Sequence, residues 1–385
     1  MFHRLPRLAA TLALLLACAA PSRANESVTY QINPQHTGSA MFQAGLNLPL
    51  RQLWTRSFGG PVSYPVIAAG TVLVTAGLNS YDGTVLYALD RASGATLWSQ
   101  GIPGTYFNSF VAYDNGNVFV LNYDGWLRAF KVSTGAPLWQ AQMPGQYSFQ
   151  DPPTARDGFV YITGAGSGAT VYAVRQLDGK VVWSQSVNGG DSAPTLSEDG
   201  VFVSFPCQAY EFDIATGVPR WHVNNACSGG GGATTVLYDQ LLITSWLNAS
   251  ALQDGIVLRA LDAVQIADMP GPTYFPPAVQ SGMSYFVTAG NIVARDVPAF
   301  TQKWTFAPDS QVAAPPIVVN GKVIVTTNSG RMNVLDGASG ALLQTLQLPP
   351  GSVGCPCGLK VSLAAGQATI VAPYDRILTA FVGAP

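Results

Sequence analysis

Histidine and cysteine carry much of the catalytic and metal-binding chemistry of proteins, and both are scarce in this 385-residue sequence. Only His36 and His222 follow the first 24 residues, so the sequence offers neither a histidine-rich metal site nor a pair of catalytic imidazoles. It contains no two adjacent cysteines and no Cys-x-x-Cys-His haem attachment motif. We therefore predict no catalytic residues, no metal site and no bound cofactor.

The overall composition limits the possible partners. The net charge is -2 and only 10% of the residues are charged, whereas a protein that binds a phosphate backbone needs a basic surface. Nucleic acid is not an expected partner. Forty Gly and 27 Pro indicate short strands that are separated by tight turns.

Residues 1–24 have the features of a signal peptide. Basic residues precede an apolar run over residues 8–20 that is too short to span a bilayer. Ser22 and Ala24 supply the small residues that signal peptidase needs, so we predict cleavage after Ala24 and a periplasmic or extracellular protein. Alternatively, Cys18 lies in a lipobox-like sequence and would be lipidated, which would tether the protein to a membrane. No later stretch predicts a transmembrane segment.

A repeat of the form Ala-x-Asp-x-x-Thr/Ser-Gly-x-x-x-Trp recurs about every 40 residues along the chain. Two copies lack the Trp, Leu258–Asp268 and Val334–Gln344. We interpret the tryptophans as structural residues, each lying over the backbone of the neighbouring repeat near the motif's Gly. These residues are Trp54, Trp98, Trp139, Trp183, Trp221 and Trp304.

A period of this length with four short apolar runs is typical of a four-stranded propeller blade. The strands expected in the first unit are Val62–Ala68, Val72–Ala76, Val85–Leu89 and Thr96–Gln100. The outer strands number eight, but the last unit supplies only Leu359–Ala364, Ala368–Ala372 and Ile377–Phe381. Arg51–Phe58 in turn has no blade of its own.

The sequence therefore predicts an all-β, eight-bladed β-propeller of four-stranded antiparallel blades. Pairing of the N-terminal strand with the C-terminal blade would close the ring and remove its exposed edges. The expected organisation is a signal peptide (1–24), an N-terminal extension (25–48) and a single propeller (49–385).

The Ala, Asp, Thr, Gly, Trp pattern resembles the tryptophan-docking repeat of the PQQ-like (pyrroloquinoline-quinone repeat) propellers. Residues Asn33–Gly38 also resemble the entry segment of such proteins. The resemblance implies the propeller fold, but not one function, because the scaffold serves quinone-dependent dehydrogenases and an outer-membrane assembly lipoprotein alike. It further implies that a PQQ dehydrogenase would carry adjacent cysteines, a calcium site and long insertions. This sequence has no adjacent cysteines, and its loops are short.

The cysteines that follow the signal peptide are even in number, which favours disulfides in an exported protein. Cys207 is expected between the second and third strands of its blade and Cys227 in the next connection, on the same face, so these two form our first pairing. Cys355 and Cys357 are expected on that face about half a turn away. They would pair with each other in a strained ring or remain a reactive dithiol.

Aromatic residues and two aspartates lie on or beside connections that lead into inner strands, on the cysteine-bearing face. They could surround one mouth of the central channel and bind a peptide, a glycan or a planar ligand. The simpler interpretation is packing between blades. The candidates are Tyr106, Phe107, Tyr147, Phe149, Asp151, Asp191, Tyr274 and Phe275.

We thus expect an exported, non-enzymatic binding or scaffold protein that engages a protein or polymer through the cysteine-bearing face. One alternative is a PQQ-dependent quinoprotein oxidoreductase, with PQQ and a divalent cation at the channel mouth. Another is a propeller lipoprotein that assists outer-membrane protein assembly, which requires lipidation of Cys18.

Overall fold

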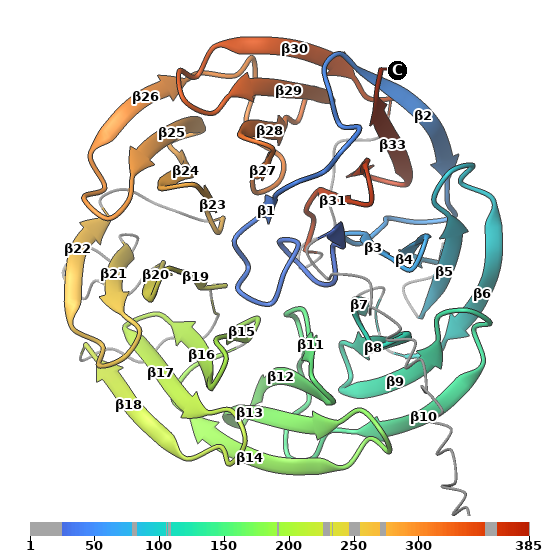
Figure 1. Ribbon diagram of the computed structural model, residues 1–385. Coiled ribbons are helices and arrows are strands. Elements are labelled where there is room, and N and C mark those ends of the chain that lie inside the picture. The colour runs from blue at the N-terminus through green and yellow to red at the C-terminus, as the bar shows by residue number, and fades with distance from the viewer. Residues whose placement is uncertain are drawn as a thin grey trace, which may run out of the picture.

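Eight blades surround a central axis in the computed structural model, and all of their regular elements are β-strands (Figure 1). The predicted eight-bladed propeller is confirmed. The structure describes residues 25–78, 83–104, 106, 109–190, 192–225, 232, 234–245, 255–269, 275–350 and 360–384. Over these ranges, no helix has the length and hydropathy required to cross a membrane.

The first blade shows the order that the others repeat, from the axis outward. It consists of β3 (Val66–Ala68), β4 (Thr71–Gly77), β5 (Thr84–Asp90) and β6 (Thr96–Ile102). The inner strand is shorter than the predicted Val62–Ala68. Val62 forms only an isolated bridge with Ala76, since Pro65 has no amide hydrogen with which to continue the ladder.

Six further blades follow along the chain, and β1 (Ser39–Ala40) adds a parallel strand on the axial side of the seventh. Blades 2 to 4 are β7 (Ser109–Asp114), β8 (Asn117–Asn122), β9 (Trp126–Lys131), β10 (Pro137–Gln142); β11 (Thr154–Arg156), β12 (Phe159–Gly166), β13 (Gly168–Arg175), β14 (Val181–Val187); and β15 (Thr195–Leu196), β16 (Gly200–Phe205), β17 (Gln208–Asp213), β18 (Pro219–Asn224). Blades 5 to 7 are β19 (Val236–Tyr238), β20 (Leu241–Thr244), β21 (Gly255–Arg259), β22 (Gln265–Met269); β23 (Ala278–Gln280), β24 (Met283–Thr288), β25 (Asn291–Asp296), β26 (Gln302–Phe306); and β27 (Ile317–Val319), β28 (Lys322–Thr326), β29 (Arg331–Asp336), β30 (Leu342–Gln347).

The eighth blade combines the two ends of the chain, as predicted. β2 (Leu50–Ser57) is its outer strand and pairs with β33 (Ile377–Gly383), with Trp54 opposite Ala380. Inside them lie β32 (Thr369–Tyr374) and β31 (Ala364–Gly366), so the inner strand begins five residues later than expected. The shared blade closes the ring.

Two faces follow from the strand order. The turns between the first and second strands and between the third and fourth strands lie on one face, which we call the turn face. The loops between the second and third strands and the connections between blades lie on the other, which we call the connection face. Cys207 and Tyr147 are on the connection face.

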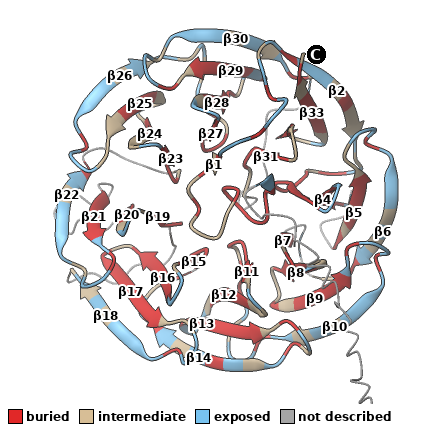
Figure 2. Cartoon of the chain, in the orientation of Figure 1, coloured by how far each residue is buried: buried red, intermediate tan, exposed pale blue. Residues whose placement is uncertain are grey.

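Burial falls from the axis to the rim (Figure 2). Every residue of β4 is buried, whereas the outer strand β10 alternates between exposed and half-buried residues. The apolar clusters lie between adjacent blades rather than within one. Packing of each blade against its neighbours therefore holds the ring together.

Candidate functional site

The central channel contains residues 25–43 of the chain itself (Figure 1). Ser27 exchanges two backbone hydrogen bonds with Ile67 of blade 1, at 2.9 and 2.8 Å. In blade 2, the Tyr113 amide donates to Val28 O at 2.8 Å. The inner strand of a blade has an unpaired edge toward the axis, and this segment supplies the partners that such an edge needs.

The same segment contacts each of the remaining blades in turn. Thr29 Oγ1 donates to Pro153 O of blade 3 at 2.8 Å, and Gln31 Nε2 donates to Ser362 Oγ beside blade 8 at 2.9 Å. Amides of the other inner strands donate to carbonyl oxygens of the segment. These bonds are Leu196 N to Pro34 O (2.9 Å), Leu237 N to Gln35 O (3.0 Å), Val279 N to Thr37 O (2.8 Å) and Val318 N to Gly38 O (2.8 Å).

His36 lies at the centre of this channel segment and is fully buried. Its Nδ1 is 2.7 Å from Tyr30 O, and its Nε2 is 3.3 Å from Thr154 Oγ1 and 3.0 Å from Pro194 O. Burial lowers the pKa of His36, although the two carbonyls and Asp151 act in the opposite direction. A neutral ring donates to only one of these two carbonyl oxygens. If Nδ1 carries the proton, Tyr30 O accepts from it, Nε2 can accept from the Thr154 hydroxyl, and Pro194 O receives no hydrogen bond from the ring.

The lowered pKa of His36 predicts a loss of stability in mild acid. At a pH below 6.5, the ordinary pKa of histidine, His36 binds a proton in the unfolded chain but not in the folded chain. The free energy of unfolding therefore falls by up to about 1.4 kcal/mol per pH unit. Urea unfolding of the wild type and His36→Gln at pH 7.5 and 5.5 measures this. The wild type should lose more stability than the variant. Equal losses would contradict the assignment, because His222 is present in both proteins.

Asp151 and Lys360 form an ion pair at the connection-face end of the channel. Lys360 Nζ is 2.9 Å from Asp151 Oδ1, and the aspartate side chain is only 4% exposed. Asp151 also contributes to the raised pKa of Tyr30 and Tyr64, although burial is the larger cause. Lys360 was not among the predicted residues. The sequence did contain a clue to Lys360, because it is a single basic residue just before an inner strand, and charged residues are rare in this chain.

The other predicted binding residues do not form one ring. Tyr147 and Tyr106 are exposed, by 66% and 49%. Phe149 is fully buried between blades 2 and 3, because Gly125 and Gly164 leave room for its ring, so its expected place at the mouth is wrong. Phe275 is partly buried against the cluster between blades 6 and 7. Phe107, Asp191 and Tyr274 lie outside the described residues.

One of the predicted disulfide cysteines can be placed. Cys207 is buried and disulfide-bonded. Cys227, Cys355 and Cys357 lie outside the described residues, so the pairing of Cys207 with Cys227 stays a prediction.

The six tryptophans predicted as structural residues each form the same hydrogen bond with the next blade. Each Nε1 donates to a carbonyl oxygen in the turn between that blade's third and fourth strands. The pairs are Trp54 to Arg91 (2.9 Å), Trp98 to Val132 (2.7 Å), Trp139 to Gln176 (2.7 Å), Trp183 to Ile214 (3.1 Å), Trp221 to Ala260 (2.8 Å) and Trp304 to Gly337 (3.0 Å). A Cβ atom on Gly135 would lie 2.6 Å from the Trp98 ring, which explains the motif's Gly.

Two junctions depart from this pattern. Between blades 5 and 6, Ala267 pairs with Val257 at the tryptophan position, so the predicted repeat Leu258–Asp268 was placed one residue too late. Phe300 occupies the glycine position and fills the cluster beside Ala267. Between blades 7 and 8, Gln344 replaces Trp and exchanges two 2.8 Å hydrogen bonds with the backbone of Leu50.

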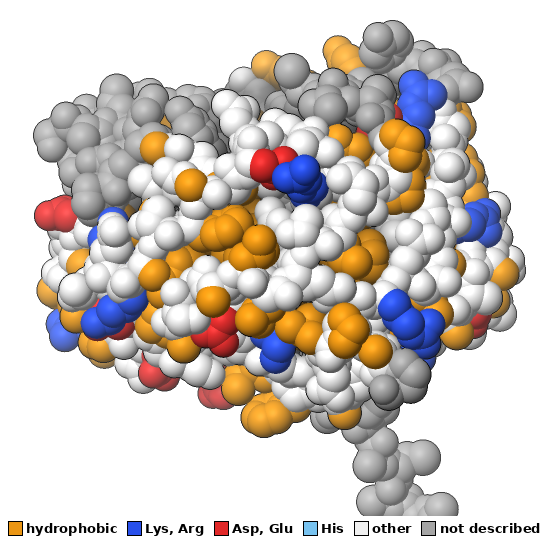
Figure 3. Space-filling model, turned by 90° about the horizontal axis from the view of Figure 1, so that it is seen from above, with side chains coloured by type: hydrophobic (Ala, Val, Ile, Leu, Met, Phe, Trp, Pro, Cys, Tyr) orange, Lys and Arg blue, Asp and Glu red, His pale blue; other side chains and the backbone are white. Residues whose placement is uncertain are grey.

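The described residues do not fit a divalent cation at the channel mouth. Ca²⁺ takes about six to eight oxygen ligands, and the carboxylate identified there, Asp151, is paired with Lys360. Over the described ranges, no three His, Cys, Asp or Glu side chains are grouped for a metal ion. On the side drawn in Figure 3, acidic and basic side chains are scattered rather than gathered into a patch of one sign.

This architecture is similar to that of known proteins. Residues 81–237 match the PQQ_2 family model, described as outer membrane protein assembly factor BamB. The quinohemoprotein alcohol dehydrogenase of Comamonas testosteroni superposes with a TM-score of 0.75 and 14% identity, over 95% of this chain and 82% of the dehydrogenase. The chain has the fold of the PQQ-like β-propellers.

Two curated relatives of this PQQ-like propeller have different functions. The outer membrane protein assembly factor BamB of Burkholderia pseudomallei is 24% identical over 331 residues, which cover 78% of this chain and 83% of that protein. The tetrathionate hydrolase of Acidithiobacillus ferrooxidans is 27% identical over 174 residues, 40% of this chain. The match spans only 34% of the hydrolase. The fold therefore leaves more than one function open.

Proposed function

We propose that this PQQ-like propeller is an exported, non-enzymatic scaffold that binds a protein partner through its connection face. The observation that carries the proposal is the central channel, which the chain fills with its own residues. Ser27, Thr29, Gln31 and His36 are all at most 1% exposed there. An axial ligand would have to displace a segment that is hydrogen-bonded to every blade, so function is assigned to the outer surfaces.

Exposed aromatic residues support the choice of face. Tyr147 donates to Gly166 O at 3.1 Å, and its ring lies over that glycine while 66% of the residue stays exposed. Tyr106 packs edge-on against Tyr123, with ring centroids 4.6 Å apart. Large aromatic side chains whose position is fixed by neighbouring residues are common binding residues in protein interfaces.

In-cell photo-crosslinking tests this proposal. A photoreactive phenylalanine replaces Tyr147 on the connection face, or Val182 on the outer strand β14 as a control that is also exposed. We expect a discrete adduct with an envelope protein from position 147 and none from position 182. No adduct from position 147, or the same adducts from both positions, would contradict the assigned face.

A role in outer-membrane protein assembly is the second candidate. It is favoured by the match to the Burkholderia pseudomallei assembly factor, which extends over most of both chains. In the native bacterium, loss of this protein would then lower the amount of folded outer-membrane β-barrels. Unchanged levels would remove this candidate and leave the broader scaffold proposal standing.

A further inference from the structure

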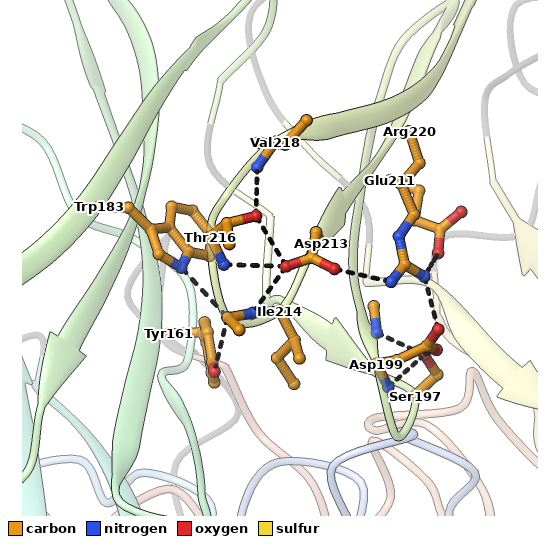
Figure 4. A network of polar contacts seen from close by, with 12 residues as sticks. Tyr161, Trp183, Ser197, Asp199, Glu211, Asp213, Ile214, Thr216, Val218 and Arg220 are labelled. Carbon is orange, nitrogen blue, oxygen red and sulfur yellow. Dashed lines mark hydrogen bonds and ion pairs between the residues drawn. The ribbon is translucent and has the colours of Figure 1, made fainter.

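Arg220 joins three carboxylates on the turn face of blade 4 (Figure 4). Its Nη1 is 2.8 Å from Asp199 Oδ2 and 3.0 Å from Glu211 Oε1, and its Nη2 is 2.9 Å from Asp213 Oδ2. One guanidinium thus faces three acidic groups. The cluster keeps an excess of negative charge, and Arg220 is already engaged on both terminal nitrogens.

Glu211 is the unusual member of this cluster. It pairs with Trp221 across β17 and β18, at the position where blades 1, 2, 3 and 6 have Ala88, Ala129, Ala173 and Ala294. Its side chain is only 4% exposed, and its Oε2 has no hydrogen-bond partner within the described part of the chain. In Figure 4 the second carboxylate oxygen carries no dashed line.

A buried carboxylate oxygen without a partner is costly, and the other blades show that alanine fits the same position. The Trp221 side chain is close enough to lower the pKa of Glu211, but its one N–H donates to Ala260 O at 2.8 Å. Burial raises the pKa of Glu211, although Arg220 acts to lower it. The site thus lacks one hydrogen-bond donor.

A cavity of about 350 Å³ adjoins this carboxylate between blades 4 and 5. Its lining includes the charged side chains Glu198, Asp199, Glu211 and Arg220, of which three are acidic, and the apolar side chains Phe202, Leu237 and Leu261. This volume is at the small end of the range of about 300–1,000 Å³ for ligand pockets. It suits a group of side-chain size with an apolar stem and a positively charged end.

We propose that this cavity binds an aliphatic cation, an ammonium or guanidinium group on an apolar stem. Glu211 Oε2 accepts a hydrogen bond from the cation, and Phe202 and Leu237 contact the stem. An anion does not fit, because Arg220 already donates to three carboxylates. The site lies on the turn face, opposite the connection face, so it goes beyond the proposed function and does not depend on it.

Two sources could supply such a group, a free small amine or a basic side chain of a protein. Calorimetric titrations of the whole mature protein distinguish them with agmatine and with the capped tripeptide Ala-Arg-Ala. Saturable binding of agmatine supports the proposal with a free cation as ligand. Binding of the tripeptide alone supports it with a protein side chain as ligand. Failure of both probes to bind overturns it.

Matched variants assign any binding to the cavity. Glu211→Gln keeps the shape of the side chain but removes its charge, and it should weaken binding of the probe by about tenfold or more. Glu211→Ala restores the residue of the other blades and provides a second folded variant. Asp178→Asn makes the same charge change at an Arg175 ion pair in blade 3 and should leave the affinity unchanged. Equal affinity of the wild type and both Glu211 variants would contradict the proposal that the cation binds in this cavity.

Discussion

Ala267→Trp combined with Phe300→Gly should recover stability that each single change loses. Phe300 is 4% exposed and packs in the cluster that Ala267 borders. Phe300→Gly leaves a cavity, for which we expect a loss of about 3–5 kcal/mol. Ala267→Trp alone inserts a large ring against Phe300, at an expected cost of about 1–3 kcal/mol. The double variant recreates the Trp-over-Gly contact of the other junctions.

The backbone at Phe300 already has the conformation of the glycine position at the other junctions. The Phe300 amide donates to Asp296 O at 2.8 Å, as the Gly340 amide donates to Asp336 O at 2.8 Å, and Phe300 has a φ of 55°. Glycine adopts that conformation without strain. Chemical denaturation of the four proteins gives the coupling free energy of the cycle. Additive losses would show that Phe300 does not take the place of the tryptophan.

Gly135→Ala should destabilise the propeller more than Gly116→Ala, although both glycines belong to blade 2 and have φ values of 71° and 76°. A Cβ atom at Gly116 meets nothing within 4 Å, so that change costs only the left-handed conformation, about 1–2 kcal/mol. At Gly135 the new atom would lie 2.6 Å from the Trp98 ring. We expect about 1–3 kcal/mol more for this contact.

Thermal and urea unfolding of the two variants measure the difference, and Gly116→Ala controls for the backbone term. Adding Trp98→Ala to Gly135→Ala is a further check. Relative to Trp98→Ala alone, the Gly135→Ala change should then cost no more than Gly116→Ala does. Equal destabilisation of the two glycine variants would mean that the tryptophan contact does not constrain position 135.

The repeat made the fold predictable from the sequence. Trp and Gly at fixed positions gave the blade count, and the unmatched strand near Trp54 gave the closure of the ring. The loss of Trp at Ala267 led to a one-residue error in one copy of the repeat, because no tryptophan marked its end. Phe300 gave no help, since its role depends on its contact with the neighbouring blade. Phe149 was misplaced for a similar reason, since its room depends on Gly125 and Gly164 of separate strands.

The filled channel was not predictable in the same way. Residues 25–43 contact the blades largely through backbone carbonyls and amides, whose positions the side-chain pattern does not reveal. Glu211 did carry a signal, because it interrupts a column of alanines in the repeat. The free Oε2 atom and the adjoining cavity required the structure.

Calorimetric titration of the mature protein with PQQ in calcium-containing buffer tests the central claim most directly, once disulfide formation has been verified. The filled channel and the pairing of Asp151 with Lys360 predict no saturable binding. Tight one-to-one binding would contradict the account. It would mean that a quinone displaces the channel segment, and it would favour the oxidoreductase alternative.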